Sequence, residues 1–139
     1  MAIEKKMEVA ADIGKATESI VKDMAEMFGN VFIPQISLDE FAHRASDAID
    51  NKMLPVIQDG NEFIDGRYKL ELVANNSFRS SFEIYFKNTD GEIMEMSGES
   101  KIFSLNRLKE EDRQELSLKK EISYEVHEPQ AKVTRTPVD

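Results

Sequence analysis

The feature that most constrains this chain is a stretch of alternating polar and apolar residues between Arg67 and Phe103. The stretch reads RYKLELVANNSFRSSFEIYFKNTDGEIMEMSGESKIF, and two short clusters of turn-forming residues interrupt it. Strict alternation puts every second side chain on one face of a strand, whereas a helix face repeats about every 3.6 residues. The pattern therefore predicts three antiparallel strands joined by two hairpin turns.

The apolar residues on either side of the second turn predict its length. A three-residue loop from Thr89 to Gly91 places Phe86 opposite Met94, and opposed residues lie on the same side of a sheet. A two-residue loop would place Phe86 opposite Glu95, which would mix the buried and exposed faces. We therefore predict the longer loop, with Gly91 in the left-handed conformation that such hairpins use.

The first hairpin can be placed in the same way. A loop of residues 75 to 77 would put Leu70 opposite Phe82 on the buried face. The same register would put Lys69 opposite Glu83 on the other face. Because it gives one apolar pair and one opposite-charge pair, this is the register that we predict.

Some apolar residues are expected on the face of the sheet that points away from the buried one. Alternation places Val73, Tyr85, Ile93 and Phe103 on this outer face, and it places Ile102 on the buried face. Apolar residues grouped within a charged surface are typical of a contact with another protein, although singly exposed apolar residues are common. These four outer residues are our candidate partner-binding site.

Two helices are predicted before the strands, and a third after them. Residues 2 to 28 carry apolar residues at spacings of three and four, which is the repeat of one helix face. A second helix begins after Ser37, because Ser37 and Glu40 have the spacing of a capping box. We expect Pro55 to end or kink that helix. Residues 104 to 113 predict a short charged helix.

A fourth strand is predicted from the alternation between residues 116 and 126. The elements together predict an α+β fold, in which two N-terminal helices pack on a four-stranded antiparallel sheet and a short helix precedes the last strand. This order resembles cystatin-like or NTF2-like layouts in architecture, although no motif assigns the chain to either family. We expect one domain over residues 1 to 128 and a flexible tail over residues 129 to 139.

The first predicted helix is a candidate for self-association. Its apolar stripe includes Ile3, Met7, Ala10 and Gly14, and the two small residues allow another backbone to approach closely. At about 1.5 Å per residue the helix is about 40 Å long, which exceeds the width of a four-stranded sheet. We therefore predict a homodimer that forms through this helix or through the outer sheet face.

Charge and composition exclude several functions. The 27 acidic residues outnumber the 18 basic ones, which gives a net charge of −9. Because binding to phosphate groups needs clustered lysine and arginine, we expect no nucleic-acid partner and no binding to an anionic membrane. No apolar run approaches about 18 residues, and no signal peptide is recognisable. The absence of cysteine excludes disulfides, and we expect a cytoplasmic protein.

Few residues suggest catalysis or metal binding. Four polar residues share one predicted helix face: Asp39, His43, Asp47 and Asp50. Ordinary solvent-facing helices look the same, and nothing completes a ligand set. His127 would need a serine such as Ser80 or Ser81 beside it to act as a catalytic base, and no known catalytic motif is present. We therefore predict no catalytic residue, no metal and no cofactor.

Two functions remain open. The first is a non-enzymatic intracellular protein-interaction module, such as an adaptor, an assembly subunit or a small inhibitor or immunity-type protein. The second is a domain that binds a small-molecule ligand, or catalyses a reaction, in a cavity between the helices and the sheet. Methionines adapt to irregular space and would suit such a cavity. The candidates for its walls are Met24, Met27, Met53, Met94 and Met96.

Overall fold

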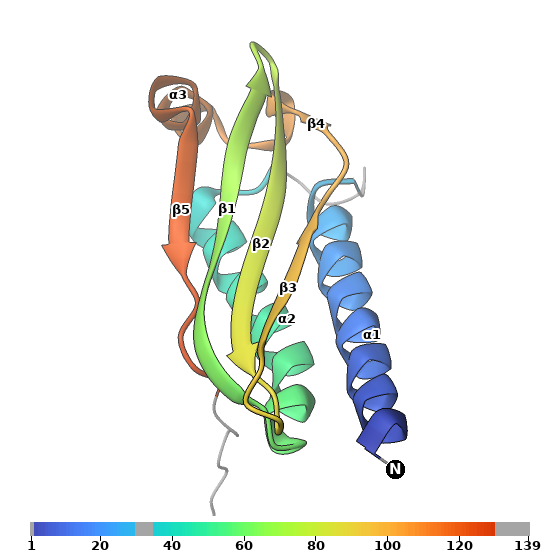
Figure 1. The fold of residues 1–139 in the computed structure, drawn as a ribbon. Helices are drawn as coiled ribbons and strands as arrows, with labels where there is room; N and C mark the ends of the chain where they lie inside the picture. The colour runs from blue at the N-terminus through green and yellow to red at the C-terminus, as the bar shows by residue number, and fades with distance from the viewer. Residues whose placement is uncertain (1, 30–34, 130–139) are drawn as a thin grey trace, which may run out of the picture.

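The computed structural model describes residues 2–29 and 35–129, with side chains described from residue 14 onward. Two long helices cover one face of an antiparallel sheet (Figure 1), which confirms the predicted α+β class. The elements are α1 (Ala2–Gly29), α2 (Leu38–Gln58), β1 (Glu62–Ala74), β2 (Ser77–Lys87), β3 (Ile93–Glu99), β4 (Phe103–Ser104), the 3₁₀ helix η1 (Leu105–Arg107), α3 (Glu110–Lys119) and β5 (Glu121–Glu125).

The strands lie in the order β3-β2-β1-β5, and β4 pairs with β2 beyond the end of β3. The sheet therefore has five strands, one more than predicted, because the two-residue strand β4 pairs separately. The face that the helices cover, here called the inner face, contributes Leu70, Phe78, Phe82 and Ile84 to a continuous core. None of the described helices packs on the opposite face, here called the outer face (Figure 1).

The predicted second hairpin is confirmed. Phe86 lies opposite Met94, Ile84 lies opposite Met96, and Gly91 has a φ of 81°. The first hairpin differs from the prediction, because Leu70 lies opposite Ser80 and not opposite Phe82. A shift by two residues keeps every side chain on its predicted face.

The physical reason for the shift is a bulge at Val73. The register of β1 and β2 changes between Leu72 and Ala74, so Val73 has no direct partner and a tighter turn joins the strands. The observed register also places Glu71 opposite Arg79, whose Nε lies 3.1 Å from the Glu71 carboxylate. The observed register therefore has two directly opposed opposite-charge pairs, this one and Arg67 with Glu83, where the predicted register has one.

A second bulge lies between β3 and β4. Ser81 lies opposite Glu99, whereas Phe78 lies opposite Phe103, so three steps along β2 match four steps along the neighbouring chain. At the start of this irregularity, the hydroxyl of Ser100 accepts a backbone amide of β2 at 3.0 Å. One extra residue moves every following side chain to the other face of a sheet.

The predicted orientations of Ile102 and Phe103 are wrong for this reason. Ile102 is 58% exposed, and Phe103 is only 7% exposed. The Phe103 ring lies 5.6 Å from that of Phe28 and 6.1 Å from that of Phe78, measured between centroids. Phe103 therefore belongs to the core and not to the outer face.

Helix α2 begins as predicted but extends farther. The Ser37 hydroxyl accepts the amide of Glu40 at 3.1 Å, which confirms the cap. The helix does not end at Pro55, because it continues to Gln58 and the Pro55 carbonyl accepts the amide of Asp59. Val56 is buried in the core, and its burial offsets the hydrogen bond that the proline cannot make.

The region after β4 also differs from the prediction. Ser104 caps η1, and α3 then extends to Lys119, where a strand was predicted to have begun already. Leu116 is fully buried and Leu118 is 83% exposed, so two leucines that fit a strand pattern lie on a helix. The three acidic residues in the first turn of α3 favour the helix through its dipole.

Among the described residues, no helix combines the length and the apolar character needed to cross a membrane. The predicted tail, residues 129 to 139, lies outside the described residues except for its first residue.

Helix α1 packs closely against the sheet at Gly98 on β3. A Cβ atom at Gly98 would lie 2.6 Å from Cγ2 of Val21, which is closer than real contacts allow. A Cβ atom at Gly14 would have no neighbour within 4 Å. The described chain therefore needs a glycine at position 98 for packing, but not at position 14.

We predict that Gly98→Ala lowers the free energy of unfolding by about 1 to 3 kcal/mol, because the new methyl group pushes α1 away from β3. The loss should be smaller when Val21→Ala is also present. As a control, Gly14→Ala should raise stability by about 0.5 to 1 kcal/mol, since alanine favours a helix. Urea denaturation of the wild type, the three single variants and the double variant measures these effects, and equal effects at the two glycines would contradict the packing.

Candidate functional site

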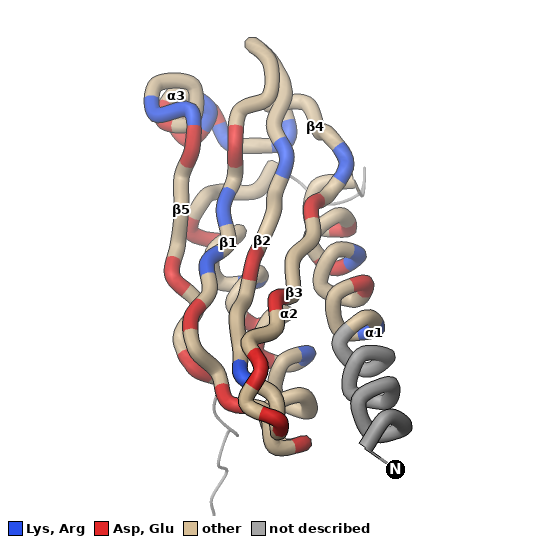
Figure 2. The backbone as a smooth tube through the Cα atoms, viewed as in Figure 1, with Lys and Arg blue, Asp and Glu red and all other residues tan. Residues whose placement is uncertain are grey.

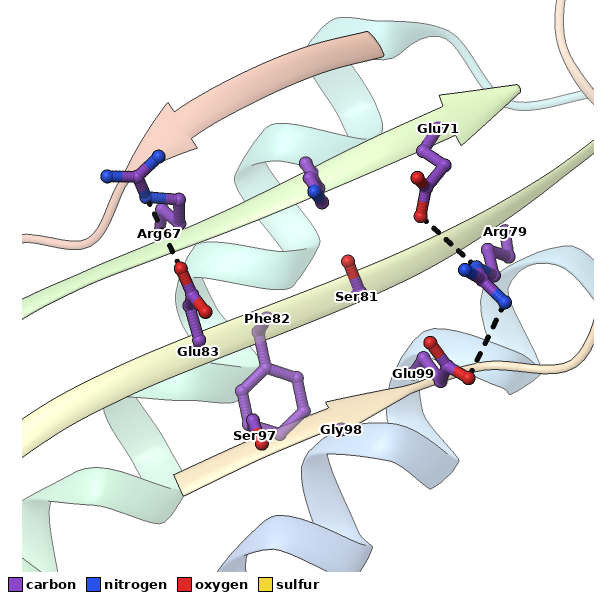
Figure 3. A pocket seen from close by; sticks show the side chains of 10 residues that line it. Arg67, Glu71, Arg79, Ser81, Phe82, Glu83, Ser97, Gly98 and Glu99 are labelled. Atoms are coloured by element: carbon purple, nitrogen blue, oxygen red, sulfur yellow. Dashed lines mark hydrogen bonds and ion pairs between the residues drawn. The ribbon is translucent and has the colours of Figure 1, made fainter. Parts of the chain in front are cut away.

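The described helices leave the outer face of the sheet open (Figure 1). Acidic and basic residues follow one another along and across its strands (Figure 2). A hollow of about 470 Å³ lies near its centre, where β1, β2 and β3 run side by side (Figure 3). Small residues, Ser81, Ser97 and Gly98, form part of its lining, together with longer charged side chains from β1, β2 and β3.

Ion pairs hold the charged rim of this hollow. Arg79 lies between Glu71 and Glu99, with nitrogen to oxygen distances of 3.1 and 3.5 Å (Figure 3). Arg67 lies 3.7 Å from Glu83 (Figure 3). On the side toward β5, Lys69 lies 3.3 Å from Glu121. These cations have carboxylate partners already, so the hollow lacks the cluster of available cations that a phosphate ligand needs.

Three apolar residues share one end of the outer face, and we call Ile64, Tyr85 and Ile93 the apolar patch. Lys87 lies opposite Ile93 and Tyr85 opposite Glu95, which makes Tyr85 and Ile93 diagonal neighbours. Ile64 lies in a bulge of β1, between the residues opposite Phe86 and Tyr85. Ile93 is 61% exposed and Ile64 is 45% exposed.

Two of the four predicted partner-binding residues thus lie together. Val73 lies at the other end of β1, in the bulge beside the first turn, and is half-buried. Phe103 lies in the core. The sequence pattern did not identify Ile64, because the predicted strand began at Arg67, whereas β1 begins at Glu62 and contains a bulge that alternation cannot locate.

The predicted self-association residues are only partly described. The side chains of Ile3, Met7 and Ala10 lie outside the described ones, although their backbone belongs to α1. Gly14 is exposed and faces open space. The homodimer therefore stays a prediction.

The residues considered for metal binding and catalysis make ordinary contacts. His43 lies 3.6 Å from Asp47, and both side chains are more than half exposed. Within the described part of the chain, no three histidine and carboxylate side chains are arranged to hold a metal. Ser80 points into the core, Ser81 lines the hollow, and His127 is an exposed residue after β5.

The methionines considered as cavity walls lie in the core. Met24, Met53 and Met96 are each at most 1% exposed, and Met27 is 5% exposed. Met94 is partly buried against the same cluster. These five residues pack the space between the helices and the sheet with the aromatic side chains around them.

A pair of stacked tyrosines lies where α2 meets β1 and β5. The rings of Tyr68 and Tyr124 are 5.1 Å apart at their centroids, and the Tyr68 hydroxyl donates to the Ala42 carbonyl at 3.1 Å. Burial, together with Tyr68 and the carboxylate of Glu115, raises the pKa of Tyr124 to about 12. Carboxylates therefore lie near Tyr124 on the inner side of the sheet, beside β5.

No family model matches this chain, and no match was found among curated proteins or among solved structures. The function of the chain therefore has to be inferred from its own geometry.

We predict that Phe103→Ala lowers the free energy of unfolding by about 3 to 5 kcal/mol, because it leaves a cavity among the core aromatic rings. Ile102→Ala should change it by less than about 0.5 kcal/mol, since Ile102 is exposed. Denaturant unfolding of both variants tests the bulge between β3 and β4. The opposite ranking would mean that Phe103 belongs to the outer face after all.

We also predict that stability falls as the pH rises from 10 toward 12. The folded state holds the Tyr124 proton more tightly than the unfolded state, whose tyrosine pKa is about 10. This contribution is complete below pH 10 and is lost as the pH passes through the folded pKa of about 12. Urea denaturation should show a smaller decline for Tyr124→Phe, and an unchanged decline would contradict the assignment.

Proposed function

We propose that this protein is a non-enzymatic interaction module that binds another protein through the outer face of its sheet. The apolar patch supports the proposal, because Tyr85 and two exposed isoleucines are grouped at one end of a face that no helix covers. Aromatic and large apolar residues surrounded by polar ones are typical of the centre of a protein contact. The charged rim beside the patch would then set the orientation of the partner.

The proposal extends to the kind of protein that would bind. The hollow has both signs of charge on its rim, so a complementary surface would carry both signs as well. Such a surface belongs to a folded protein more readily than to a nucleic acid or an anionic membrane. The lack of cysteine supports a cytoplasmic location for the pair.

The alternative, a ligand-binding or catalytic cavity between the helices and the sheet, has no comparable support. Such a site needs convergent polar groups around a space of roughly 300 Å³ or more. The described side chains in that region are mostly apolar, and the few polar groups, such as Ser80 and the hydroxyl of Tyr68, are buried within the packed core. We therefore do not propose it as a second function.

The test compares binding partners of the wild-type chain with those of the double variant Tyr85→Glu/Ile93→Glu. Two carboxylates in the apolar patch should weaken binding by about tenfold or more, because a partner would have to bury them. Proteins that the wild type recovers from a cell extract in quantitative pull-down should be depleted with the variant. Both residues are partly or largely exposed, so circular dichroism should show the same fold.

The matched control is Leu118→Glu, which places a carboxylate at an exposed apolar residue on α3. It should recover the same proteins as the wild type. If the double variant retains the wild-type partners, the apolar patch is not the binding surface. Sedimentation equilibrium of the wild type and Tyr85→Glu then shows whether the partner is a second copy, since only that case changes the mass.

A further inference from the structure

The two borders of the sheet differ in how they are covered. Helix α1 packs against β3 at one border, where Val21 meets Gly98. Strand β5 forms the other border, and β1 is its single neighbour among the described strands (Figure 1). A strand at such a border, that is, an edge strand, exposes unpaired backbone amides and carbonyls, and proteins usually cover or disrupt it.

The backbone of β5 directs alternate residues toward this open border. The Lys120 carbonyl accepts a hydrogen bond from β1 at 2.8 Å, and the Val126 amide donates to β1 at 2.9 Å. Between them the register of β5 on β1 is continuous, without a bulge. In an antiparallel pair, successive residues point alternately toward the partner strand and away from it. Three residues therefore direct their amides and carbonyls to the open border: Glu121, Ser123 and Glu125.

The side chains of the same three residues are exposed on the outer face, with a carboxylate at each end. On the outer face, charge alternates from strand to strand in the row that contains Glu125, whereas Glu121 lies directly opposite Glu71 and meets its cation diagonally. Arg67 on β1 lies opposite Glu125 on β5 and pairs with Glu83 on β2. Lys69 on β1 pairs with Glu121. A further strand beside β5 continues this alternation only if it carries cations opposite the two glutamates.

The same carboxylates disfavour a second copy of this chain at the border. The antiparallel register that overlaps all of β5 with its copy places Glu121 opposite the copy's Glu125. Like charges directly opposite one another destabilise a strand pair. Nor does β5 contain the lysine, the proline or the bulge with which border strands commonly block pairing. Within the described residues the outward backbone of β5 therefore stays available, and the two glutamates favour a strand that carries cations over a second copy.

We propose that the open border of β5 is a docking site for an extended basic segment of a partner protein, which adds to the sheet as a further strand. Its lysine or arginine residues would lie four residues apart, opposite Glu121 and Glu125. Residues between them would include β-branched ones beside Ile122 and Tyr124 on the inner side. Main-chain hydrogen bonds would supply the affinity, and the two cations would supply the specificity. This site goes beyond the outer-face function, because it involves neither the apolar patch nor the hollow.

The test uses the full chain, labelled for NMR, and a short synthetic peptide with two lysines four residues apart and valine and threonine between them. Binding should slow hydrogen exchange at the amides of Glu121, Ser123 and Glu125. Methylating the peptide nitrogens that face β5 should abolish binding, while methylating those on its other side should not. These two peptides carry the same charge, so the comparison separates strand addition from general attraction to an acidic protein.

A charge exchange supplies the second arm. The double variant Glu121→Lys/Glu125→Lys should bind the lysine peptide about tenfold more weakly than the wild type does. A peptide with glutamates in place of the lysines should bind this variant better than the lysine peptide does. The control variant Glu18→Lys/Glu26→Lys makes the same change in net charge on exposed residues of α1. It should weaken binding much less. Equal weakening by the two double variants, or equal binding of the two methylated peptides, would overturn the proposal even if the outer-face function holds.

Discussion

The packing around Phe28 is the interaction on which the rest of the structure depends. This ring, at the end of α1, contacts Phe41 of α2, Phe78 of β2 and Phe103 of β4, with centroids 5.0 to 5.7 Å apart. Two helices and the sheet therefore meet at one fully buried side chain. Because both helices are held on the inner face in this way, the outer face stays free of them, and every candidate surface for binding follows from that asymmetry.

Much of this arrangement could be predicted from the sequence because it depends on local patterns. The period-2 alternation identified β1, β2 and β3, and the pairing of Phe86 with Met94 identified the second turn. The Ser37 cap identified the start of α2. Each of these features is determined by residues close together in the chain or by the need for one apolar face, so a single sequence contains enough information.

The errors share a different physical cause, which is that a bulge has no periodic signature. The extra residues at Val73 and between β3 and β4 lie beside contacts between neighbouring strands, namely the ion pair of Glu71 with Arg79 and the hydrogen bond that Ser100 accepts from a β2 amide. An alternating pattern predicts which face each side chain occupies only while the strand is regular, and it does not show where an extra residue is inserted. The irregularity after Ser100 places Phe103 in the core and not in the predicted binding site, and a separate bulge in β1, between Phe63 and Asp65, contains Ile64. The sequence also could not predict that β5 is an edge strand, because this depends on the order of all the strands in the sheet.

The outer face and the β5 border also constrain each other through Arg67 and Lys69. Both side chains extend from β1 between the hollow and β5, and each has a carboxylate partner, Glu83 for Arg67 and Glu121 for Lys69. A cation that docks beside Glu121 would compete with Lys69 for the same carboxylate. Released from that pair, Lys69 would face the hollow with an unpaired charge, which would attract acidic groups to the outer face. Exposed pairs of this kind contribute at most about 1 kcal/mol each, so any coupling between the two surfaces would change affinity by only severalfold. Binding of one partner would then change the affinity for the other severalfold, but each partner would still bind alone.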